Sequence, residues 1–132
     1  MSNLQQTFVI FGALLGFLGI AAGAFGAHLF KTKLSVEMLQ AFETAARYQM
    51  YNALTLIVLA ALIGVFHSAW FTCAGGFLII GTFIFSGSLY LLTLSGIRFF
   101  GAVTPIGGVL IILGWLCIFL GGLFGRGINV PS

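Results

Sequence analysis

The chain has 132 residues, of which 61% are hydrophobic and only 5% are charged. Soluble domains contain about 45–50% apolar and about 25% charged residues, so this composition excludes an ordinary soluble protein. The mean hydropathy of +1.20 also excludes a disordered chain, which requires low hydrophobicity and high charge. The net charge of +3 comes from cations at the edges of apolar segments and not from one basic patch, so we expect no nucleic-acid partner.

Four segments are long and apolar enough to cross a bilayer, whose core of about 30 Å takes about 20 helical residues. They are residues 8–30, 47–66, 71–94 and 105–124. We therefore predict an all-α integral membrane four-helix bundle that forms a single domain over residues 1–132. The first segment has the small-residue run of a signal peptide. However, it is too long for a signal core and follows no Lys or Arg, so we expect a retained helix.

The second segment is purely apolar only over residues 53–66, which is too short to span a membrane. Its helix must therefore begin near Arg47 and carry polar side chains to membrane depth. Residues 36–46 form an amphipathic lead-in with Ser35 as its N-cap. This lead-in either lies on the membrane surface or extends the second helix.

The start of the fourth segment has two interpretations. Thr104 is a plausible N-cap with Pro105 at the first helical position, which predicts a helix over 105–124 and an interfacial connection before it. The alternative is a longer helix from Phe99 with a kink at the proline.

Regularly spaced glycines predict two faces for close helix packing, because small residues let helix backbones approach in lipid. In the first segment the spacing is 4, 3, 4, 3, and in the fourth it is seven. These residues are Gly12, Gly16, Gly19, Gly23 and Gly26, followed by Gly107, Gly114 and Gly121. The faces serve contacts within the bundle, self-association, or contacts with another subunit of a larger complex.

Polar residues gather on one side of the membrane if the four helices alternate in direction. They are His28, Arg47, Tyr48, Gln49, Asn52, Ser86, Tyr90 and Thr104. We predict a candidate ligand-binding cluster that opens to the side of the first and third loops. In it, Arg47 would hold an anionic group, His28 would titrate and the tyrosines would donate hydrogen bonds. The alternative is a structural network that fixes the order of the helices.

Motifs for catalysis are absent from the sequence: there is no Walker loop, zinc-protease helix, CxxC pair or nucleophile elbow. The only carboxylate side chains are Glu37 and Glu43, which lie near the same loop and are not a suitable pair for acid–base catalysis. We therefore expect no catalytic residue, no metal, no cofactor and no enzymatic activity. A membrane-embedded enzyme that uses Ser86 or Ser88 with His28 remains a minor alternative.

The distribution of Lys and Arg predicts the orientation of the chain. The loop after the first segment carries Lys31 and Lys33, and the loop after the third carries Arg98. The other side has only Arg126. Since short cytoplasmic loops are enriched in Lys and Arg, we expect both loops in the cytoplasm and both termini outside.

Four ordered motifs resemble those of the YgdD/YwdK-like family of small membrane proteins, a domain-of-unknown-function family. They are AGAFGAH at 22–28, YQMYNAL at 48–54, FSGSLY at 85–90 and TPIGG at 104–108. The resemblance covers about residues 8–124. It implies a four-helix protein of the bacterial inner membrane without an assigned activity. Asn52 stands where the family pattern has a histidine, which weakens any expectation of metal or proton chemistry with His28.

Composition, spacing and resemblance together predict an integral membrane protein of unknown biochemical activity. We expect a non-enzymatic bundle that contacts membrane lipid and acts as a homo-oligomer or as an accessory subunit. The alternative is a binder or transporter of a small amphiphile or lipid that uses the polar cluster.

Overall fold

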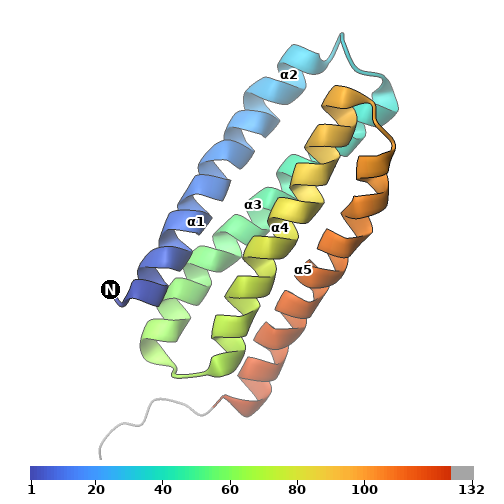
Figure 1. Ribbon diagram of the computed structural model, residues 1–132. Helices are drawn as coiled ribbons and strands as arrows, with labels where there is room; N and C mark the ends of the chain where they lie inside the picture. Colours follow the sequence, from blue (N-terminus) through green and yellow to red (C-terminus); the bar gives the residue numbers. More distant parts are fainter. Residues whose placement is uncertain (126–132) are drawn as a thin grey trace, which may run out of the picture.

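The computed structural model describes residues 1–125, and its regular elements are helices (Figure 1). They are α1 (Asn3–Ala21), the π-helical segment η1 (Ala22–Gly26), α2 (Ala27–Phe30), α3 (Val36–Val65), α4 (Ala69–Ser95) and α5 (Phe99–Phe124). The first three run on as one rod, so the described chain has four rods that are each long and apolar enough to cross a membrane. This confirms the predicted all-α membrane bundle.

The four rods pack in sequence order, α1 on α3, α3 on α4 and α4 on α5. Residues 31–35 and 96–98 connect helices at one end of the bundle, which we call the loop end (Figure 1). The N-terminus, residues 66–68 and the last turn of α5 lie at the opposite end. A core of large apolar side chains joins all four rods, including Phe8, Leu15, Leu56, Leu78 and Ile111.

Local capping explains where the first two rods begin. Ser2 forms a capping box with Gln5, in which the Ser2 hydroxyl accepts from the Gln5 amide at 3.1 Å and the Gln5 side chain accepts from the Ser2 amide at 2.9 Å. Helix α1 therefore begins earlier than the predicted residue 8. Ser35 caps α3 as predicted, and the lead-in over 36–46 is continuous with the second helix. The lead-in thus extends that helix.

The predicted start of the last helix at Pro105 is wrong, since α5 begins at Phe99 and Pro105 lies inside it. Thr104 is not an N-cap: its hydroxyl donates to the Phe100 carbonyl at 3.1 Å. The proline has no N–H for the carbonyl of Gly101, one turn earlier. Helices in membranes tolerate such a loss where side chains and local geometry compensate for it.

The predicted packing glycines face neighbouring helices of the same chain. A Cβ built at Gly12 would lie 3.0 Å from the Ala53 carbonyl oxygen, and one at Gly19 would lie 3.0 Å from Met50 Sδ. Gly16, Gly23 and Gly26 also face α3, whereas Gly107, Gly114 and Gly121 face α4. The first glycine series therefore seats α1 on α3, and the second seats α5 on α4.

Candidate functional site

The eight polar residues singled out from the sequence do not form one cluster. Gln49, Ser86 and Tyr90 meet between α1, α3 and α4. The remaining five lie elsewhere: Asn52 and Tyr48 face a groove beside α5, Thr104 contacts α4, Arg47 lines a hollow on α1, and His28 is exposed. The expected single vestibule is therefore wrong, because neighbouring residues on a helix point about 100° apart.

Gln49 connects three helices from a buried position on α3. Its Nε2 donates to the Leu15 carbonyl on α1 at 2.8 Å, and its Oε1 accepts from the Tyr90 hydroxyl on α4 at 2.6 Å. Only 4% of Gln49 is exposed. Both ends of the amide are therefore satisfied by the protein, and their positions fix the orientation of the side chain.

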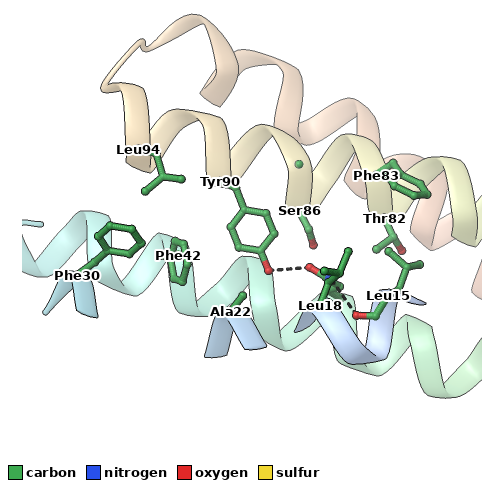
Figure 2. Close-up of a pocket in the computed structure, with 12 residues that line it drawn as sticks. Leu15, Leu18, Ala22, Phe30, Phe42, Thr82, Phe83, Ser86, Tyr90 and Leu94 are labelled. Carbon is green, nitrogen blue, oxygen red and sulfur yellow. Dashed lines mark hydrogen bonds between the residues drawn. The ribbon is translucent and has the colours of Figure 1, made fainter. Parts of the chain in front are cut away.

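Ser86 and Thr82 lie one turn apart on α4, and both are buried. Figure 2 shows them, with Tyr90, pointing from α4 toward α3. The Ser86 hydroxyl donates to the Ala45 carbonyl at 2.8 Å, which fixes the register of α4 on α3. The Thr82 hydroxyl has no hydrogen-bond partner in the described part of the chain. A buried polar atom without a partner is costly, so Thr82 marks a place where polar satisfaction is incomplete.

A lateral cleft of about 370 Å³ lies over these residues, between the α1–η1–α2 rod and α4 (Figure 2). Its floor is Phe42 and Gln49 on α3, and its two walls are mostly apolar. The lining residues on the walls are Leu15, Leu18, Ala22 and Phe30 on one side and Thr82, Phe83, Ser86, Gly87, Tyr90 and Leu94 on the other. From Thr82 to Leu94 the cleft extends about 18 Å along the helix axis.

The cleft exists because α1 packs on α3 and not on α4 over this stretch. Nearer the N-terminus the two helices do meet, where Phe11 and Phe83 pack edge to face at 6.1 Å between ring centroids. Toward the loop end a row of aromatic rings crosses the floor, with Phe42 at 5.6 Å from Phe30 and 5.1 Å from Tyr90. The cleft is therefore open sideways on the surface of the bundle, and aromatic rings form its floor toward the loop end.

Asn52 belongs to a different contact, between α3 and α5. Its Oδ1 accepts from the Trp115 indole N–H at 3.2 Å, while its Nδ2 has no partner among residues 1–125. Tyr48 packs edge to face against Phe85 at 5.4 Å and lines the same groove, which has a volume of about 600 Å³. The sequence did not single out Trp115. Its position near the middle of α5, away from the interfacial belt typical of tryptophan, is the signal that could have found it.

Thr104 meets Ser88, with 2.6 Å between their hydroxyl oxygens. Ser88 also lies 3.0 Å from the Phe85 carbonyl, and Thr104 lies 3.1 Å from the Phe100 carbonyl. The two hydroxyl groups have two protons for these three contacts, so only two of the three hydrogen bonds form at the same time. The pair links α4 to α5 near the loop end and does not reach the lateral cleft.

The remaining candidates are on the surface. His28 is exposed in α2, and the hydroxyl of Ser86, its suggested catalytic partner, is bonded to the Ala45 carbonyl. Arg47 is exposed on α3 beside Glu43 and lines a hollow on the far side of α1. Among residues 1–125, no group of three or more His, Cys, Asp or Glu side chains is arranged to hold a metal ion. Arg126, used in the orientation prediction, lies outside the described residues.

These features define a class of protein: a four-helix integral membrane protein with a lateral, largely apolar cleft. Residues 22–108 match a family described as a protein of unknown function, DUF423. The chain is 45% identical over 117 residues to a UPF0382 membrane protein of Staphylococcus saprophyticus, covering 89% of this chain and 97% of that one. It is 38% identical over 115 residues to the UPF0382 inner membrane protein YgdD of Escherichia coli K12, covering 87% and 88%.

The chain therefore belongs to the DUF423/UPF0382 family of membrane proteins, which confirms the resemblance found in its four motifs. The name of the Escherichia coli relative agrees with the predicted location in the bacterial inner membrane. No solved structure matches the chain. The family name carries no biochemical activity, so the cleft is the basis for a functional proposal.

Proposed function

We propose that this protein is a non-enzymatic binder of a single-chain amphiphile, whose hydrocarbon chain lies in the lateral cleft between α1 and α4. The observation that carries the proposal is the chemistry of the cleft. Gln49, Tyr90 and Ser86 line it, yet their polar atoms bond to the protein itself. Apart from the buried Thr82 hydroxyl, which has no partner among residues 1–125, the cleft therefore offers a ligand apolar surface. A volume of about 370 Å³ suits one chain and is too narrow for another helix.

The loop end of the cleft supplies positive charge. Phe30 lines the cleft and Lys31 follows it directly, with Lys33 in the same loop. Arg98 lies in the other loop at this end. A hydrocarbon chain gains little by leaving the bilayer for an apolar cleft, because lipid tails are equally apolar. Selectivity must then come from the shape of the cleft and from the charge at its end, which favours an anionic headgroup such as a carboxylate.

The glycine series gives less support to self-association than the sequence suggested, since both series contact helices of the same chain. Self-association and an accessory role in a larger complex stay predictions. The side chains suggested for catalysis do not lie together, which favours a binding role: His28 is exposed, and the Ser86 hydroxyl is bonded to the Ala45 carbonyl.

The test fills the cleft without disturbing the fold. A Cβ at Gly87 would meet no atom of residues 1–125 within 4 Å, and Gly87 lines the cleft. Gly76 lies on the same helix with the same free space but does not line the cleft. We expect Gly87→Leu to weaken binding of radiolabelled palmitate to the nanodisc-embedded protein by about tenfold or more, which is about 1.4 kcal/mol. Gly76→Leu, the matched control, should bind as the wild type does.

Two outcomes would overturn the proposal. Equal palmitate binding by the Gly87→Leu and Gly76→Leu variants would show that the chain lies outside the cleft. No saturable binding to the wild-type protein would show that the cleft holds only bulk lipid.

A further inference from the structure

Glu43 and Arg47 lie one helical turn apart on α3, and both are exposed. They flank a hollow of about 330 Å³ between the α1–η1 rod and α3, on the other side of α1 from the lateral cleft. The rest of its lining is small or apolar: Gly19, Ile20, Gly23, Ala24, Ala46 and Met50. The hollow and the lateral cleft share no lining residue, so a ligand in the hollow is independent of the proposed function.

Arg47 lies below the apolar rim of the bundle. Gly23 faces Ala46, so the exposed Phe25 and Leu29 lie nearer the loop end than Arg47 does. The hydrogen bond from the Ser86 hydroxyl to the Ala45 carbonyl places Ser86 of α4 at about the same height along the bundle as Ala45. The exposed side chains of Leu91 and Leu94 lie beyond it, again toward the loop end.

Arg47 is the twelfth residue of α3, about 16 Å of helical rise from its start. Four exposed apolar side chains on the two flanking rods would contact water if the membrane ended at this arginine. These side chains favour a hydrocarbon layer that extends past Arg47 on the flanking rods. A charged side chain at that depth on a lipid-facing surface is costly unless it finds a partner, and such residues mark functional sites.

The direction of the helix decides where these charges point. Side chains on a helix lean toward its N-terminus, and the N-terminus of α3 is at the loop end. Both side chains therefore extend toward the headgroup layer on that side, as long charged side chains do near membrane surfaces. Along the backbone, Arg47 lies about 6 Å deeper in the membrane than Glu43, which is the rise of four residues.

We propose that this hollow binds a phospholipid whose headgroup carries a primary ammonium, such as phosphatidylethanolamine, from the leaflet at the loop end. In such a lipid the phosphate is the deeper charge and the ammonium the shallower one, which is the order of Arg47 and Glu43. The guanidinium donates to two phosphate oxygens, and the Glu43 carboxylate accepts N–H from the ammonium. The small side chains of Gly23 and Ala24 leave room for the start of one acyl chain.

This arrangement predicts a specific order of lipids. Phosphatidylcholine keeps the phosphate and the positive charge but has no N–H to donate to Glu43. Phosphatidylglycerol keeps the phosphate but has no cation to pair with the Glu43 carboxylate. The site should therefore retain phosphatidylethanolamine best.

The experiment uses the full-length protein in nanodiscs with equal amounts of these three lipids, followed by native mass spectrometry of the lipids that stay bound. We expect phosphatidylethanolamine to exceed each of the other two by about tenfold. Glu43→Gln should remove the preference over phosphatidylcholine, and Arg47→Gln should reduce retention of all three. Glu37→Gln, which removes an exposed carboxylate of the same helix outside the hollow, is the matched control and should behave as the wild type.

A second measurement needs no substitution. Mono-, di- and trimethylation of the ethanolamine removes its N–H groups one at a time, so retention by the wild-type protein should fall in steps. Equal retention of the three lipids, an unchanged preference in Glu43→Gln, or a flat response to methylation would each overturn the proposal. So would a stable dimer in which Arg47 is protected by a second copy of the chain and no lipid is bound.

Discussion

The contact between α4 and α5 provides a sharp test of the fold, because two adjacent glycines on α5 differ in their surroundings. A Cβ at Gly107 would lie 2.7 Å from Phe85 Cα and 2.8 Å from the Gly81 carbonyl oxygen. A Cβ at Gly108 would lie 3.7 Å from Phe85 Cδ2, an ordinary contact. Substitution by alanine therefore adds the same methyl group to the same helix, at Gly107 where the space is filled and at Gly108 where it is open.

The expected difference in stability follows from two terms. Replacing glycine by alanine inside a helix stabilises it by about 1 kcal/mol, and this gain applies to both variants. At Gly107 the added methyl group meets backbone atoms, which cannot rotate away. The two helices must then separate by about 1 Å to restore carbon–carbon contacts near 3.5 Å. Overpacking of this kind costs about 1–3 kcal/mol, so Gly107→Ala should be less stable than Gly108→Ala by at least about 1 kcal/mol.

The measurement is reversible unfolding of both variants in mixed detergent micelles, followed by far-ultraviolet circular dichroism, with the wild type as reference. We expect Gly108→Ala to be as stable as the wild type or more so, and Gly107→Ala to be less stable. Equal free energies of unfolding for the two variants would refute the close approach of the α4 and α5 backbones.

Three further predictions concern other contacts. Tyr90→Phe removes one interhelical hydrogen bond and should cost about 0.6 kcal/mol of unfolding free energy, whereas Gln49→Leu removes two and should cost more. The double variant should cost less than the sum, because the two residues share one bond. Gly75→Ala brings a Cβ against three carbons of the Phe8 ring, two of them nearer than the third at 2.7 Å, and Phe8 is buried in the core, so this variant should also be less stable than the wild type. For orientation, Lys33→Cys in a background without the native cysteines should react with an impermeant maleimide only after the cells are opened; labelling in intact cells would reverse the predicted topology.

Much of the fold could be predicted from the sequence, because bilayer thickness and helical rise fix how many apolar residues a span needs. Composition alone separates the four segments. The glycine spacing also marks the faces on which α1 and α5 approach their neighbours. The prediction was wrong at Pro105, because a proline in the second turn resembles a helix start and because the residues before it, from Phe99, carry no strong helix signal of their own.

The candidate site was less predictable, because sequence order does not say which face of a helix meets which neighbour. From the order and direction of the helices alone, the sequence predicted that the polar residues lie on one side of the membrane. That reasoning gives the height of a residue along its helix but not the direction in which its side chain points. Whether Ser86 reaches α3 or Thr104 reaches α4 depends on the rotation of each helix about its axis. That rotation is decided by packing, since the buried apolar side chains and the close glycine contacts must all be accommodated together.

By itself, the sequence determined that this protein spans the membrane four times, which glycines line its packing faces and to which family it belongs. Only the tertiary structure decided how the polar residues are used. Arg47, Tyr48 and Gln49 are consecutive, yet they face a hollow on α1, a groove beside α5 and the buried centre of the bundle. Each residue turns the helix by about 100°, so three neighbours in sequence meet three different surroundings, and only the positions of the other helices define them.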